Sequence, residues 1–141
     1  MKYTPDPLLS SDPVGITEYL VREFNKLALV LDKLEATNIN YGRETINTAS
    51  TATTVINWKA GQKQMVEMNA STTFTFNAPE GVCNLMLRIV YNGSYTPTFP
   101  SSIKWQGGTT PTWSAANTKV DVIAMYYDGT NYHATASLDS K

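Results

Sequence analysis

The sequence predicts a mainly β protein: an extended N-terminal arm and one α-helix, followed by a small antiparallel β-sandwich or barrel-like domain. Charge is distributed unevenly, since residues 1–35 hold ten charged residues and the next 106 hold thirteen. Seventeen threonines follow that break, and threonine favours strands. Apolar residues at helical spacing end near Ala36. We therefore expect an anchoring arm and oligomerisation helix over residues 1–36 and a β domain over residues 37–141.

The arm is expected to extend to about Ile16. Each of its prolines has φ restricted to about −65° and disfavours a helical conformation at the preceding residue. An extended peptide of this kind can lay side chains into pockets on a partner at low ordering cost. We interpret it as an anchor, with packing against its own subunit as the alternative. The candidate anchoring residues are Tyr3, Pro5, Pro7, Leu8, Leu9 and Pro13.

The helix is expected to end at about Glu35, and the sequence leaves two starting points open. Asp12 is an N-cap followed by proline, and Thr17 is a second cap candidate. Apolar residues then recur at spacings of four and three, which is typical of a coiled-coil seam and also suits packing against the chain's own sheet. Val21, Ala28, Leu29 and Val30 form a broad apolar flank beyond the seam, which favours self-association, as a trimer. The candidate oligomerisation residues are Leu20, Phe24, Leu27, Leu31 and Leu34.

Seven short strands are predicted after a polar linker that occupies Asn38–Thr54. In the fourth strand one alternating face is apolar and includes Cys83, which is expected in the core. The sixth strand is apolar on both faces apart from Asp121, which is typical of a central strand or of one covered by a second subunit. The predicted strands are 53–59, 64–69, 72–77, 83–92, 103–105, 119–127 and 132–137.

A long loop from Phe99 to Trp113 carries two tryptophans, two glycines and two prolines. Trp105 and Trp113 are candidate ligand contacts, because exposed indoles can stack on sugar rings. The alternative is that they close the end of the sandwich. We favour that alternative, since so small a core needs its large aromatic side chains.

Several function classes are disfavoured by composition. The formal net charge of −1 offers no field for nucleic acid, and no apolar run approaches the roughly 20 residues that cross a bilayer. Cys83 and His133 are the only residues of their kinds, so we expect no multi-cysteine metal site, no cofactor and no catalytic residue. The least favoured hypothesis is an enzyme that uses Glu67 and Glu80 as an acid–base pair, because nothing in their spacing brings the two residues together.

Motifs at both ends resemble those of tailed-phage fibre and virion-attached proteins. The opening motifs are Tyr3-x-Pro5-Asp6-Pro7, Ser11-Asp12-Pro13 and Tyr19-Leu20-x-Arg22-Glu23-Phe24-x-Lys26-Leu27. The closing motifs are Ile103-Lys-Trp105-x-Gly107-Gly108-x-x-Pro111, Lys119-Val-Asp121-Val122 and Tyr127-Asp128-Gly129-Thr-Asn131-Tyr132. Together they cover about half the chain. The resemblance implies an N-terminal peptide attached to the capsid or tail and a β domain projecting outward, commonly as a trimer.

The first functional hypothesis is a structural component of a tailed-phage virion, either a short head or tail fibre or a capsid decoration protein. Its partners would be copies of itself and a capsid or tail protein, and it would be assembled in the host cytoplasm and reside in the virion. The second is a receptor-binding module whose β domain recognises host-surface glycan. Scarce carboxylates in the β region weaken the second, since sugars often attract charge-assisted hydrogen bonds.

Overall fold

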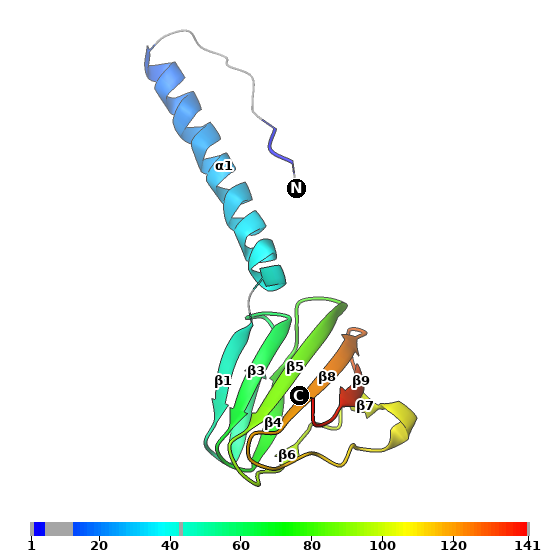
Figure 1. The fold of residues 1–141 in the computed structure, drawn as a ribbon. Helices are drawn as coiled ribbons and strands as arrows, with labels where there is room; N and C mark the ends of the chain where they lie inside the picture. Colours follow the sequence, from blue (N-terminus) through cyan, green and yellow to red (C-terminus); the bar gives the residue numbers. More distant parts are fainter. Residues whose placement is uncertain (1, 5–12, 43, 141) are drawn as a thin grey trace. The chain divides into compact units, whose positions relative to one another are not determined.

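The computed structural model describes residues 2–4, 13–42 and 44–140, and the side chains of residues 34–42 lie outside the description. The chain divides into two units, a helical unit (Met1–Tyr41) and a β unit (Gly42–Lys141). Figure 1 shows one long helix in the first unit and a stack of strands in the second. The mainly β class, with a helix ahead of the sheets, is confirmed.

The helical unit contains α1 (Pro13–Gly42). Its start at Pro13 agrees with the first of the two expected starting points, since proline suits the first helical position. Thr17 is inside the helix, where its hydroxyl donates to the Pro13 carbonyl at 2.8 Å. The predicted end at Glu35 is wrong, because the helix continues to Gly42. Between these residues the chain has no proline or glycine to stop it, and glycine is a common helix terminator.

The β unit contains all seven predicted strands and two that were not predicted. Three have the predicted bounds, and four differ by one or two residues. The two additional strands are β1, in the segment expected to be a linker, and the two-residue β6. The strands are β1 (Thr45–Ala49), β2 (Thr53–Asn57), β3 (Lys63–Met68), β4 (Thr72–Asn77), β5 (Cys83–Tyr91), β6 (Pro97–Thr98), β7 (Ile103–Trp105), β8 (Val120–Tyr127) and β9 (Tyr132–Ser137).

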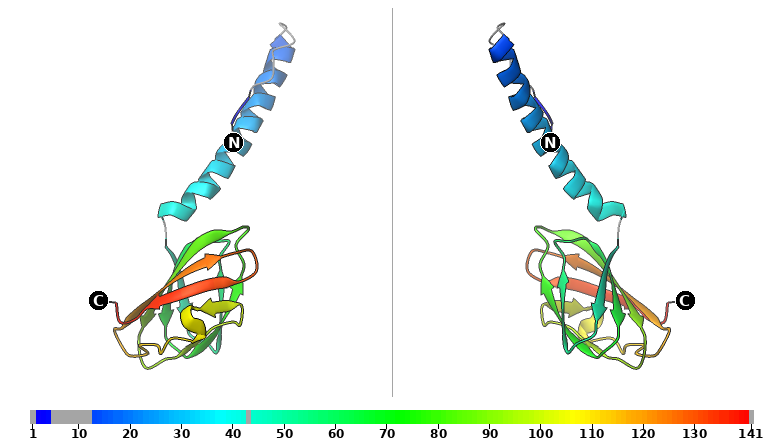
Figure 2. Two further views of the ribbon diagram at one scale, coloured as in Figure 1. Left: turned by 90° about the vertical axis from the view of Figure 1, so that its right-hand side faces the viewer. Right: turned by 90° about the vertical axis from the view of Figure 1, so that its left-hand side faces the viewer.

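The strands form two sheets, one of six strands in the order β1-β3-β5-β8-β9-β7 and one of three in the order β2-β4-β6. Five of the seven pairings among the described strands are parallel, so the expected antiparallel arrangement is wrong in this respect. From β1 to β6 the chain alternates between the sheets, and each return to a sheet therefore runs in the same direction. Figure 2 shows the two sheets as layers of one body.

Successive turns of this winding stack on one another. Thr53 pairs with Thr73 in one sheet, and Met68 pairs with Tyr91 in the other. At the corner after β3 and β5, the Asn92 side chain donates to Asn69 Oδ1 at 2.9 Å. These contacts join residues about one coil apart, which is the interaction pattern of a repeat structure.

The core lies between the sheets and includes residues from both. Trp58, Phe74, Tyr91 and Ile123 are at most 2% exposed. Cys83 is partly buried against the same core, and burial raises the pKa of its thiol. β8 lies between β5 and β9, as expected for a central strand. The β unit thus has a continuous core of its own.

Candidate assembly and anchoring surfaces

The described part of the arm contacts the helix of its own subunit. The Tyr3 hydroxyl donates to Glu23 Oε2 at 2.7 Å, although the two residues are 20 positions apart. Glu23 is 6% exposed and also accepts from Lys26 Nζ at 3.3 Å. Tyr3 therefore fits the alternative reading of the arm, in which it packs on its own subunit.

The other candidate anchoring residues are divided by the description. Pro13 is exposed and forms the first residue of α1, so it belongs to the helix rather than to an extended peptide. Four remaining residues lie outside the described part of the chain: Pro5, Pro7, Leu8 and Leu9. Anchoring through these four stays a prediction.

The predicted seam forms one side of α1. Leu20, Phe24 and Leu31 are 45%, 65% and 50% exposed, and Leu27 is half-buried. The side chain of Leu34 lies outside the description. Large apolar side chains in contact with water at this spacing are the features of an uncovered coiled-coil surface.

The side of α1 opposite the seam is different. Leu29 lies nine residues after Leu20, about 2.5 turns of helix, and so points away from the seam. It is 63% exposed and contributes to a concavity of about 480 Å³. Val21 also lines it, and the other described lining residues are polar or charged: Thr17, Glu18, Arg22, Asn25 and Lys26.

The two candidate ligand-binding tryptophans pack against each other and against the core. Their ring centroids are 5.4 Å apart at an interplanar angle of 66°. Phe99 lies 5.4 Å from the Trp105 ring and 5.0 Å from the Trp113 ring. Phe99 in turn contacts Phe74 of the buried core at 5.2 Å. This arrangement agrees with the interpretation that the indoles close one end of the β unit.

Beside this aromatic cluster lies a cavity of about 150 Å³. Thr135 donates to the Gln106 side chain at 2.9 Å across it. Small-molecule sites commonly occupy about 300–1,000 Å³, so the cavity is too small to enclose a sugar ring with its substituents. Its lining residues are Trp105, Gln106, Thr109, Pro111, Ala134, Thr135 and Ala136.

Asp121 is the polar centre of the β unit, a role that the sequence did not predict. It is 0% exposed and accepts four hydrogen bonds. The donors are the Tyr91 hydroxyl at 3.0 Å, the backbone N–H and hydroxyl of Ser114, and the backbone N–H of Asp139 at 2.9 Å. Burial raises the pKa of the Tyr91 hydroxyl, and the Asp121 carboxylate raises it further.

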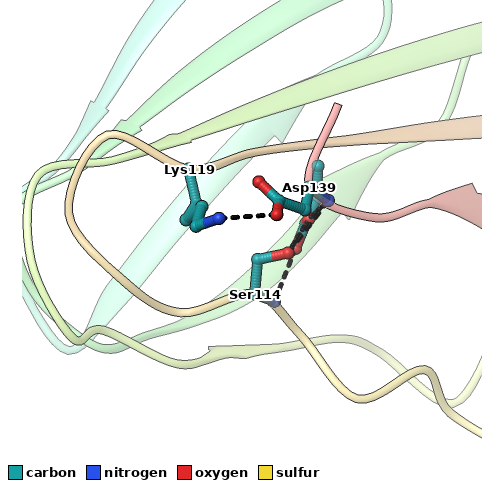
Figure 3. Close-up of polar contacts among 4 residues, drawn as sticks. Ser114, Lys119 and Asp139 are labelled. Atoms are coloured by element: carbon teal, nitrogen blue, oxygen red, sulfur yellow. Dashed lines mark hydrogen bonds and ion pairs between the residues drawn. The ribbon is translucent and has the colours of Figure 1, made fainter. Parts of the chain in front are cut away.

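Strained backbone surrounds this carboxylate. Ala115, Thr118 and Asp139 have φ values of 37°, 66° and 51°, which residues other than glycine rarely adopt. Figure 3 shows Ser114, Lys119 and Asp139 converging, with an ion pair of 2.5 Å between Lys119 and Asp139. Such strain persists where surrounding contacts overdetermine it. Here the hydrogen bonds to Asp121 join the loop before β8 to the segment after β9.

The turn between β8 and β9 is fixed by Asp128. Its Oδ1 accepts from the backbone N–H groups of Thr130 and Asn131, each at 2.8 Å. Its Oδ2 lies 2.7 Å from Nε2 of His133, an exposed residue of β9. Hydrogen bonds from Asn131, His133 and Thr130 lower the pKa of Asp128 to about 2. Both residues thus have a structural part in the hairpin.

The described residues contain no group of three or more His, Cys, Asp or Glu side chains arranged to hold a metal ion. Among the helices described, none has the length and apolar character that crossing a membrane requires.

Comparison with protein-family models, curated protein sequences and solved structures gave no match. The functional interpretation therefore depends on the surfaces described above and on the motifs in the sequence.

Proposed function

We propose that this chain is a structural component of a tailed-phage virion, a short head or tail fibre or a capsid decoration protein. In this proposal α1 associates with copies of itself, the arm anchors the protein to a capsid or tail protein, and the β unit projects outward. The proposal assigns no catalytic activity and no cofactor.

The observation that carries the proposal is the uncovered seam of α1. An isolated helix in water gains little stability from its backbone alone, and most helices are stabilised by burying an apolar face. Leu20, Phe24 and Leu31 remain between 45% and 65% exposed in the single chain. Association of three helices would bury them, and the motifs around this seam are those that resemble virion-attached proteins.

The arm contributes to the proposal with a correction. Because Tyr3 binds Glu23, we assign Tyr3 to positioning the arm on α1. The anchoring contacts then come from Pro5, Pro7, Leu8 and Leu9. A proline-rich segment loses little backbone entropy on binding, which suits a peptide that docks on a larger particle.

Deletion of residues 2–12 tests the anchoring role. All of α1 and every strand remain, so the shortened protein should fold and associate like the full chain, as judged by circular dichroism and sedimentation. Virions assembled with it should lack the protein in their mass-spectrometric composition. A matched control is Tyr3→Phe, which removes only the hydrogen bond to Glu23 and should leave incorporation intact. Normal incorporation of the deletion would contradict anchoring by the arm.

The glycan-binding alternative has less support. Trp105 and Trp113 pack on each other and on Phe99 through edge-to-face and tilted ring contacts. Both indoles are half-buried, and the cavity beside them is too small for a sugar ring with its substituents. We therefore place the structural role first.

A further inference from the structure

Within the six-stranded sheet, the outward side of β8 is unusually apolar. On β8 every residue that points away from the core is apolar: Val120, Val122, Ala124 and Tyr126. Tyr126 is 47% exposed, and Met86 on β5 is 44% exposed. A sheet with one face in water ordinarily alternates apolar and polar residues, so this pattern differs from that of a solvated face.

The strand register makes these residues neighbours. Met86 pairs with Ala124, and Val90 pairs with Val120. On the other side of β5, Met65 pairs with Ile46 of β1, whose side chain is 68% exposed. Figure 1 shows β1, β3, β5 and β8 side by side. We call this set the outer apolar face: Ile46, Met65, Met86, Val90, Val120, Val122, Ala124 and Tyr126. Met65 is 8% exposed and is its one buried member.

Three charged residues lie on the same side of the sheet: Arg88 of β5, and Lys63 and Glu67 of β3, which pair with Met86 and Val90. Arg88 points outward from β5, and its Nη2 lies 2.6 Å from Oε2 of Glu44. The hydrogen bond from Arg88 lowers the pKa of Glu44. Two cations, Lys63 and Arg88, and two anions, Glu44 and Glu67, thus balance on this side, which offers no field of one sign to a partner such as nucleic acid.

Other surfaces of the β unit have the ordinary polar character. In the three-stranded sheet, the exposed residues are Thr53, Val55, Asn57, Thr73, Thr75, Asn77 and Thr98, of which only valine is apolar. β9 exposes His133, Thr135 and Ser137. Because β9 pairs with β8, its three polar residues form one border of the outer apolar face, whose apolar side chains gather on β8 and β5.

We infer that the outer apolar face packs against the β units of other copies of this chain. This inference rests on the proposed self-association of α1. The chain has only two residues between Gly42 and Thr45, which span about 11 Å at most from one Cα to the other. Helices in a coiled coil lie about 8–10 Å apart, so association of α1 holds the β1 strands of all copies close together. β1 borders the outer apolar face. The apolar surfaces nearest to this face are therefore those of neighbouring copies.

Thiol accessibility in the full chain tests the inference. On a Cys83→Ser background, Ala124→Cys places a thiol in the outer apolar face, and Thr75→Cys places a control thiol on the exposed side of the other sheet. Maleimide reaction rates are compared in the associated protein and in the form carrying Leu27→Asp and Leu31→Asp. Contact between copies should slow the Ala124→Cys reaction about tenfold or more in the associated protein, because reaction then requires local opening. The Thr75→Cys rate should be the same in both forms.

Sedimentation of the same samples separates the two proposals. A trimer in which Ala124→Cys reacts as fast as in the dissociated form would overturn this inference and leave the association of α1 standing. A monomeric parent protein would contradict the association of α1 and this inference with it. Slow reaction in a protein that remains associated despite the two aspartates would support the outer apolar face and contradict the seam.

A second pair of variants keeps the test independent of the helix. Met86→Lys with Tyr126→Lys adds charge to two side chains that are already partly exposed, so the β unit should still fold. In the trimer these changes should raise the Ala124→Cys rate to that of the dissociated form. Val55→Lys, on the exposed side of the other sheet, should leave the rate unchanged. An unchanged rate in the double lysine variant would contradict the proposed contact.

Discussion

The helical unit and the β unit differ in how far their apolar side chains are exposed to solvent. In the β unit, Ile56, Phe74 and Leu87 are 0% exposed, and residues from both sheets share one core. In the helical unit, Phe24 and Val14 are 65% and 68% exposed. Burial of apolar surface is the main favourable contribution to folding, and so the β unit has its own source of stability. We expect α1 to be stabilised by association between chains.

The largest effect is expected from breaking the seam. Leu27→Asp with Leu31→Asp should convert the associated protein to monomers. Burying a carboxylate in the interface between helices costs on the order of several kcal/mol, because the charge loses its hydration. The β unit should remain folded, as its near-ultraviolet circular dichroism would report. Asn25→Asp is the matched control: Asn25 is an exposed polar residue on the side of the helix away from the seam, and the change should leave the mass unchanged. Equal sensitivity of both helix sides would contradict the seam.

A core substitution should have the converse effect. Phe74→Ala removes a fully buried ring that contacts Phe99, and should lower the free energy of unfolding of the β unit by about 3–5 kcal/mol. Urea denaturation followed by tryptophan fluorescence measures this change. Val55→Ala, on the exposed side of the same sheet, should cost much less. If the Phe74→Ala variant dissociated under native conditions while its β unit stayed folded, the assignment of association to α1 alone would be wrong.

The polar centre should be the next most sensitive position. Asp121→Ala leaves the donors on Tyr91, Ser114 and Asp139 without their acceptor, and should cost on the order of 3 kcal/mol. Hydrogen exchange should rise most in residues 107–118 and 138–140, where the strained backbone lies. Asp121→Asn keeps one acceptor oxygen and should show an intermediate loss. Uniform exchange changes throughout the β unit would contradict a local clamp.

The smallest effect concerns pH and the hairpin between β8 and β9. The pKa of Asp128 is lowered to about 2 from an ordinary value of 3.8, so its carboxylate favours the folded state above about pH 4. That contribution is lost as the pH falls from about 4 to 2. Asp128→Asn should remove this part of the pH dependence in a series of denaturation midpoints. Identical pH profiles for the parent and the variant would contradict the assigned role.

Local patterns in the sequence predicted most elements correctly. β4, β7 and β9 have the predicted bounds because turn residues flank short β-branched or aromatic runs. The end of α1 was missed, since polar residues between Glu35 and Gly42 weaken helical periodicity without stopping the helix. β1 was missed for a related reason: Thr45–Ala49 is mostly small and polar, and it forms a strand by pairing with β3.

The parallel winding required a longer-range signal. An imperfect repeat was present in the sequence, where Asn69-Ala-Ser-Thr72 and Asn92-Gly-Ser-Tyr95 occupy equivalent corners. Comparing segments at this spacing would have predicted stacked coils rather than hairpins. Asp121 carried a signal as well, because a single charge within an apolar strand must find partners when buried. Its partners, from β5, the loop before β8 and the segment after β9, depend on tertiary structure and were beyond local patterns.

Sedimentation equilibrium of the full-length parent protein at micromolar concentration measures whether α1 associates. We expect a mass three times that of one chain of 15.6 kDa, because three helices bury a broad apolar flank better than a single helix or a pair. The trimer should persist upon dilution within the micromolar range. A mass of 15.6 kDa under these conditions would contradict association through α1.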